Sequence, residues 1–130
     1  MSEILKAGCY YARKDIHKIL GGGVQDFLPH KDGIVVCICV SPEMNPHLPE
    51  TILVGEGMQV PHWARVFSQQ TNYIPMFAKR DSNKWEYIGD FRVKSISDDE
   101  KEIARHKSYS GRDDVELVLH LEKNNHQNRF

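Results

Sequence analysis

The segment that most constrains the fold lies near the middle of the chain. From Trp85 to Val93, large apolar or small residues alternate with mostly polar ones, and this period of two predicts a strand with one buried and one mostly solvated face. Residues 74–80 predict a second strand, and the polar residues 81–83 between the two strands predict a hairpin. Gly89 interrupts the apolar face, so we expect a bulge, a sharp bend or a close approach by another backbone or a ligand there.

Patterns on either side of this hairpin predict further strands and three helices. Strands are expected at 4–13, 34–40, 51–54 and 115–121. Helices are expected at 14–20 and 60–70, and a third is expected to open at 97–100 and to run through roughly 107. Asp15 should cap the first helix, and residues 97–100 should form a capping box for the third. Short, hairpin-linked strands with helices favour an α+β fold, a mostly antiparallel curled β-barrel with two to three peripheral helices. We expect one domain over residues 1–123 and a polar C-terminal tail at 124–130.

Charge and cysteine content give weaker signals. The chain has 17 basic and 18 acidic residues, but residues 61–96 hold six basic residues against three acidic ones. This local excess of three positive charges fits either a phosphate-facing patch or ordinary solvated charges on a hairpin. Cys37 and Cys39 should share one strand face as small buried hydrophobic residues, which suits a reducing, intracellular compartment, cytoplasmic in a bacterium or nuclear in a eukaryote. No signal peptide and no membrane-spanning apolar run is predicted.

The sequence does not favour an enzyme. Its seven histidines show neither the i, i+4 pairs with a carboxylate nor the Cys-x-x-Cys pairs that bind metals. Cys9 has no sequence neighbour that would orient a histidine toward it, and Asn124-Asn125-His126 lies in the polar tail, outside the strand–helix context of a nuclease. We therefore expect no catalytic residues, no cofactor and no metal.

Aromatic residues beside glycine-rich or polar turns are more informative. A flipped nucleobase needs flat apolar faces on both sides and a donor–acceptor pair for its Watson–Crick edge. Gln25 and Asp26 follow the triple glycine 21–23 and could supply the edge contacts. The aromatic candidates for stacking are Tyr10, Tyr11, Phe27, Trp85 and Tyr87. Taken alone, Trp85 and Tyr87 are better explained by core packing on a strand, and Gln25 and Asp26 are explained by loop solvation. The prediction of a pocket therefore depends on their conjunction.

The order of these pieces resembles the SRA domain (SET- and RING-associated, also called YDG) of the PUA-like superfamily, most closely the SRA-like modules attached to HNH restriction endonucleases. Residues 11–15 and 21–25 resemble the family's Tyr-x-Arg-x-Asp and Gly-Gly-x-x-Gln segments, and 54–57 its Thr-Gly-x-Gly turn. The helix ending at 67–70 and the strand 74–80 are similar to its helix and Pro-Val strand. Residues 85–93 resemble its Tyr-Asp-Gly-x-Tyr-x-Val signature. Ile88 stands where the family has aspartate, and Leu53 replaces an aromatic residue.

The resemblance implies a module that binds duplex DNA and flips a modified cytosine into a pocket. It implies that Gln25, Asp26 and Phe27 contact the base, with Tyr10 or Tyr11 stacking beside it. It also implies close backbone approach at the glycines and phosphate contacts from basic residues; these are Gly22, Gly23, Gly55 and Gly57, and Arg13, Lys79 and Arg80. A nuclease or other effector encoded separately is a possible partner.

Two other functions stay open at this point. An RNA- or protein-binding PUA-like module without base flipping is the main alternative, and the slight net negative charge favours it. A hydrolase acting on nucleic acid is the third candidate function. It would need a cluster of metal-ligating residues, which the spacing of such residues in the sequence does not predict.

Overall fold

The computed structural model describes residues 5–57 and 59–125. The chain forms two compact units, each assembled from segments that are distant in the sequence. The first unit contains residues up to 41, residues 73–91 and residues from 123 onward, and the second contains 42–72 and 92–122. The single domain expected over 1–123 stays a prediction, and most of the expected tail, from 126 onward, lies outside the described residues.

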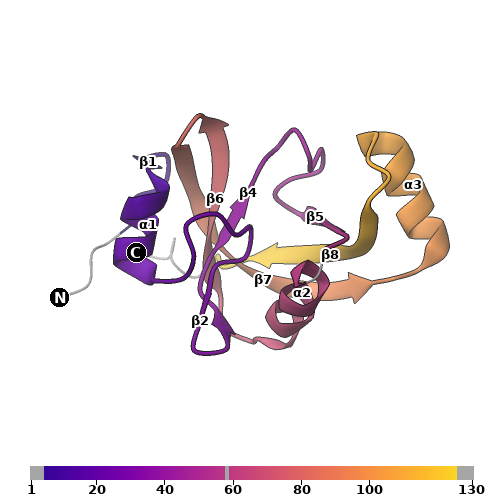
Figure 1. Ribbon diagram of the computed structural model, residues 1–130, viewed down its shortest axis with the longest axis horizontal. Helices are drawn as coiled ribbons and strands as arrows, with labels where there is room; N and C mark the ends of the chain where they lie inside the picture. Colours follow the sequence, from indigo (N-terminus) through magenta and orange to yellow (C-terminus); the bar gives the residue numbers. More distant parts are fainter. Residues whose placement is uncertain (1–4, 58, 126–130) are drawn as a thin grey trace. The chain divides into compact units, whose positions relative to one another are not determined.

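Three helices and eight strands make up the described chain (Figure 1). In order they are β1 (Tyr10–Tyr11), α1 (Arg13–Leu20), β2 (His30–Lys31), β3 (Ile34–Val35), β4 (Ile38–Val40), β5 (Thr51–Gly55), α2 (Val60–Gln69), β6 (Ile74–Asp81), β7 (Lys84–Ser97), α3 (Glu100–Ser110) and β8 (Val115–Lys123). Six strands form one sheet, in the order β4-β6-β7-β8-β5 with β1 added to β7, and β2 pairs with β3 separately. The α+β class and the three helices are confirmed.

The sheet is mixed and not closed. The β4–β6 pair is parallel, whereas β1–β7, β5–β8 and β6–β7 are antiparallel. Within residues 5–57 and 59–125 no pairing joins the two end strands, β4 and β5. The expected curled β-barrel is thus not closed by strand pairing, because β4, at one end of the sheet, is three residues long and, among the described residues, pairs with β6 only.

The central hairpin, β6 and β7, is confirmed. Trp85, Tyr87, Gly89 and Phe91 are buried, and the residues that alternate with them, Glu86, Ile88 and Asp90, are partly exposed. Met76 faces Gly89 while Phe77 faces Tyr87, so Ile88 is an extra residue and the expected bulge lies at this point. Gly89 adopts φ +126°, a backbone conformation that side-chain-bearing residues rarely adopt.

Two local predictions need correction. The apolar run 34–40 is not one strand, because β3 pairs with β2 and β4 pairs with β6. The cap of α3 is Asp99, two residues after the expected position, and its carboxylate accepts from the backbone N–H of Glu102 at 3.0 Å. Asp15 does stabilise the start of α1, but from the third helical position, by accepting from the N–H of Ala12 at 3.1 Å.

Each unit has its own apolar core. The first unit buries Ile16, Cys37, Cys39, Phe77, Trp85 and Tyr87 together. The second packs Leu53, Val115 and Val118 against Ile103. Burying one large apolar side chain contributes about 1.5–3 kcal/mol, so these clusters fix the strands that carry the site described below. Among the described helices, none has the length and apolar character needed to cross a membrane.

Candidate functional site

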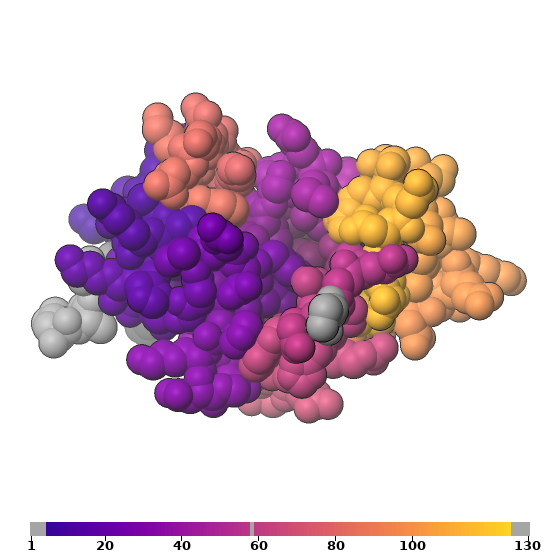
Figure 2. Space-filling view, in the orientation of Figure 1, coloured from indigo at the N-terminus to yellow at the C-terminus, as the bar shows by residue number. Residues whose placement is uncertain are grey.

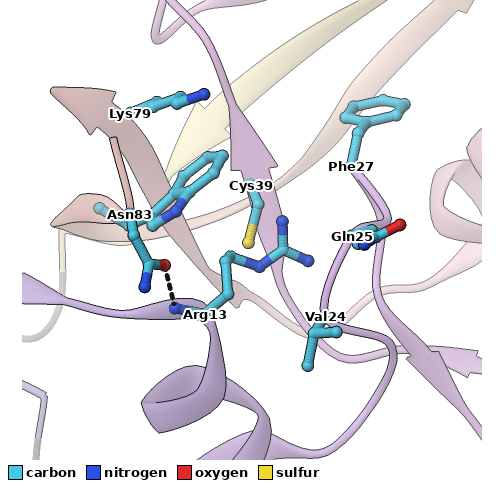
Figure 3. Close-up of a pocket in the computed structure, with 8 residues that line it drawn as sticks. Arg13, Val24, Gln25, Phe27, Cys39, Lys79 and Asn83 are labelled. Atoms are coloured by element: carbon cyan, nitrogen blue, oxygen red, sulfur yellow. Dashed lines mark hydrogen bonds between the residues drawn. The ribbon is translucent and has the colours of Figure 1, made fainter. Parts of the chain in front are cut away.

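A cavity of about 370 Å³ opens in the first unit, beside the loop that follows the triple glycine (Figure 3). This volume falls within the range of about 300–1,000 Å³ typical of small-molecule sites. The lining residues come from the start of α1, the loop, β4, β6, the hairpin turn and β7; they are Arg13, Val24, Gln25, Phe27, Cys39, Lys79, Asn83 and Trp85. On the surface of this unit, the hairpin tip (salmon in Figure 2) lies against the N-terminal segments (indigo).

The loop is shaped by its glycines. Gly22 adopts φ +81°, and a Cβ atom there would lie 2.7 Å from Pro29 Cβ and 3.0 Å from the backbone nitrogen of His30. The loop therefore folds back onto its own end, which only glycine permits at this position. At that end, the backbone N–H of Cys39 donates to the carbonyl of Phe27 at 2.8 Å. This closed loop carries Gln25 and Phe27 to the cavity wall.

Arg13 connects the separate segments of the site. Its backbone N–H donates to Asn83 Oδ1 at 3.0 Å, and its Nη2 donates to the carbonyl oxygens of Gly23 at 3.2 Å and Asp26 at 2.8 Å. Figure 3 shows its guanidinium between Cys39 and Gln25. Its Nε is buried and has no hydrogen-bond partner among the described residues. The predicted phosphate contact thus lies in the cavity wall, with part of its hydrogen-bonding capacity unused.

The cavity combines aromatic surface with positive charge. Arg13 Cζ lies 5.1 Å from the centroid of the Trp85 ring, and Lys79 Nζ lies 5.9 Å from it. Both distances fit cation–π contacts. In the part of the chain that the structure describes, neither cation forms an ion pair, and no acidic residue lines the cavity.

Two buried thiols lie in the core of this unit: Cys39 lines the cavity, and Cys37 packs in the same apolar cluster as Trp85. The hydrogen bond to Cys39 and burial raise the pKa of the Cys37 thiol. The same hydrogen bond lowers the pKa of the Cys39 thiol; burial opposes this effect, and the Arg13 guanidinium adds to it. In Figure 3 the Cys39 sulfur points toward Arg13. No cysteine among the described residues forms a disulfide.

Three of the seven predicted base-contacting residues line the cavity: Gln25, Phe27 and Trp85. The carboxylate of Asp26 is instead turned back against Gly23. Tyr10 is 57% exposed, outside the cavity lining. Their roles in binding stay predictions.

Tyr11 and Tyr87 both serve the packing of the first unit. The Tyr11 ring packs edge-on against Phe77, with 5.8 Å between centroids, and its hydroxyl accepts from the N–H of Lys6 at 3.0 Å. The Tyr87 hydroxyl donates to Asp90 at 2.6 Å. Burial, together with that bond and the nearby Asp90 charge, raises the pKa of Tyr87.

The remaining predicted residues have local structural explanations. Arg80 pairs with Glu86 at 2.7 Å. Gly55 and Gly57 belong to the second unit, where a Cβ at Gly55 would collide with the Asp114 carboxylate and one at Gly57 would press on Val60. The lining residues that sequence reasoning missed are Val24, Cys39 and Asn83. Asn83 had a usable signal, because it lies in the predicted polar turn.

A separate titratable cluster lies in the second unit. His120 Nε2 contacts Glu102 Oε2 at 2.5 Å, and His106 Nε2 lies 3.7 Å from the same oxygen. Burial lowers the pKa of His106, which more than offsets the opposing charge of Glu102. Across the described ranges, no group of three potential ligands has the arrangement needed to hold a metal ion.

Comparisons with known proteins complete the description. The model of a family described as "Domain of unknown function (DUF6697)" matches residues 10–107. A search of curated proteins found no match. Among solved structures, the chain is similar to the SUVH5 SRA domain in a crystal structure with hemi-methylated CG DNA, at 13% identity and a TM-score of 0.62. The similarity covers 96% of this chain and 92% of that one. It confirms an SRA-like fold over nearly the whole chain.

Proposed function

Because the chain belongs to the family described as Domain of unknown function (DUF6697) and has an SRA-like fold, we propose that it is a DNA-binding module that recognises a modified cytosine in duplex DNA. The base would be flipped out of the stack into the cavity beside the triple-glycine loop. A nuclease or other effector encoded separately would then act on the bound DNA.

The observation that carries this proposal is the composition of the cavity wall. Trp85 and Phe27 provide aromatic surface, and Gln25 provides an amide that both donates and accepts. A flipped base needs both features, since it loses its stacking neighbours and its pairing partner together. The cavity volume of about 370 Å³ suits a ligand the size of a base.

Positive charge near the cavity supports binding to a polyanion. Lys79 lines the cavity, and Lys84 lies across the hairpin turn from it, exposed at the start of β7. Since the chain as a whole has a net charge of −1, attraction to phosphates must come from local positive charge, for which the exposed Lys84 is a candidate outside the cavity. Binding should therefore weaken as salt is raised, with a modest slope that reflects few phosphate contacts.

The test is a comparison of Phe27→Ala with the unmutated protein. Fluorescence anisotropy at fixed salt would measure binding to duplexes that differ only at one central cytosine, plain or modified. Stacking of one base on an aromatic side chain contributes about 1–3 kcal/mol. Phe27→Ala should therefore weaken binding of the preferred duplex by about 5- to 150-fold and reduce its discrimination.

Ile34→Ala provides the matched control, because Ile34 is an exposed apolar residue of the same unit that does not line the cavity. It should leave discrimination unchanged. Equal binding of every duplex by the unmutated protein would contradict the proposal. Tighter binding to structured RNA, or to a protein partner, than to any DNA would instead favour the alternative of an RNA- or protein-binding module without base flipping.

A further inference from the structure

The polar groups of the cavity are unbalanced in favour of hydrogen-bond donors. Arg13 and Lys79 can only donate. Asn83 could both donate and accept, but its Oδ1 already accepts from the backbone N–H of Arg13 at 3.0 Å, so its amide N–H groups remain. The amide of Gln25, which also lines the cavity, can still both donate and accept hydrogen bonds. A ligand that fits this wall must supply mainly acceptors.

The residue best suited to accept from a cytosine amino group is turned away. A carboxylate is the usual acceptor for that group, and Asp26 is the nearest candidate in the loop. Its carboxylate lies against Gly23, and within the described ranges no acidic side chain lines the cavity. The amino group of cytosine would therefore meet no carboxylate in this wall, and the amide oxygen of Gln25 is the acceptor left for it.

The cationic side chains of Arg13 and Lys79 both lie near the Trp85 ring, and among the described residues no acidic side chain lies in the cavity wall beside them. Arg13 Cζ and Lys79 Nζ lie 5.1 Å and 5.9 Å from the Trp85 centroid. No carboxylate in the described part of the chain pairs with either of them, and the Arg13 Nε is buried without a partner. Contacts with a ring offset only part of the cost of desolvating a cation, and this cost falls on Arg13, whose Nε is buried, whereas Lys79 is exposed. An anion in the cavity would supply the missing partner.

On the premise that the proposed function holds, we propose that the flipped base carries an anionic substituent, and that a cytosine with a carboxylate at ring position 5 is the preferred ligand. The aromatic rings of Trp85 and Phe27 would hold the base, and Arg13 and Lys79 would donate to the carboxylate. A methyl group at the same position would leave both cations unpaired. Charge-assisted hydrogen bonds are the strongest of those available to this wall.

The experiment measures binding to four duplexes at fixed salt, with plain, 5-methyl, 5-hydroxymethyl or 5-carboxyl cytosine at one central position. The 5-carboxyl duplex should bind about 10- to 100-fold more tightly than the 5-methyl duplex, as expected for hydrogen bonds to a charged group. Lys79→Met should reduce that preference severalfold. Lys79 is exposed and forms no ion pair in the described part of the chain, so the variant should fold normally.

Lys84→Met is the matched control, because Lys84 is an exposed lysine of the same hairpin that does not line the cavity. It should weaken all four duplexes equally and leave the ratio between them unchanged. Preference for the 5-methyl duplex would overturn the carboxylate inference while leaving the proposed function standing. An equal loss for all duplexes in Lys79→Met would also overturn it, because the cation would then face backbone phosphates. Equal binding of all four by the unmutated protein would refute the proposed function itself.

Discussion

Replacing Gly22 with alanine should destabilise the loop that carries Gln25 and Phe27. Gly22 adopts φ +81°, in the left-handed region. The nearest atoms to an added Cβ are Pro29 Cβ at 2.7 Å, His30 N at 3.0 Å and Pro29 C at 3.1 Å. Two of these three atoms belong to the backbone, so the clash cannot be relieved by rotating a side chain.

The expected cost has two parts. Holding a side-chain-bearing residue in the left-handed conformation costs about 1–2 kcal/mol. Forcing a methyl group into a packed site typically costs a further 1–3 kcal/mol or so. Together they give roughly 2–5 kcal/mol, a large share of the 5–15 kcal/mol or so that stabilises a typical domain.

Gly33→Ala separates the two parts. Gly33 adopts φ +80°, but apart from its two chain neighbours no described residue has an atom within 4 Å of the position of an added Cβ. It should therefore cost only the conformational part, about 1–2 kcal/mol. Urea denaturation, followed by the fluorescence of Trp85 in a Trp63→Phe background, gives both values for the first unit. If Gly22→Ala cost no more than Gly33→Ala, the close approach between the loop and Pro29 would not exist.

Two further predictions concern the second unit. Arg112 donates to both oxygens of Asp114 at 3.0 Å and to the carbonyls of Met44 and Leu53 at 3.1 and 3.2 Å. Lysine cannot reproduce this set of guanidinium hydrogen bonds, so Arg112→Lys should lower the free energy of unfolding, measured by urea denaturation, by about 1–3 kcal/mol. A decrease below about 0.5 kcal/mol would contradict this prediction. Burial lowers the pKa of His106 from 6.5 in the folded protein. As the pH drops below 6.5, His106 therefore becomes protonated in the unfolded chain before it does in the folded chain, and the free energy of unfolding should fall. His106→Gln should flatten this fall between pH 7.5 and 5.5, and an unchanged slope would assign the fall to other groups.

The hairpin could be predicted because its signal is local. Alternation along 85–93 in the sequence assigns the buried face, and the polar turn lies between the two strands, so neither inference needs information from elsewhere in the chain. The run 34–40 has equally strong apolar character, but its two halves pair with different strands. Pairing partners are non-local, and periodicity carries no information about them. The same limit explains why the sequence alone could not predict whether the sheet closes.

In the candidate site too, features with a local sequence signal could be predicted, and features that depend on distant segments could not. The triple glycine marked a loop with close backbone approach, and two neighbouring residues, Gln25 and Phe27, do line the cavity. The direction of the Asp26 side chain could not be predicted, because it depends on the space left beside Gly23. Cys39 could not be placed either, since its position follows from the parallel pairing of β4 with β6.

Arg13 shows how structure changes the role that a sequence suggests. It was expected to face phosphates. Instead, its Nη2 donates hydrogen bonds to the carbonyls of Gly23 and Asp26, and its backbone N–H donates to the side chain of Asn83 in the hairpin turn. An anion that accepted a hydrogen bond from the Nε of Arg13 would therefore bind the same guanidinium that already orders the loop carrying Gln25 and Phe27. In the proposed complex, ligand binding and loop order would be coupled through this one side chain. A substitution of Arg13 would disturb both at once, so Lys79, which carries charge without holding the loop, is the residue at which recognition can be separated from folding.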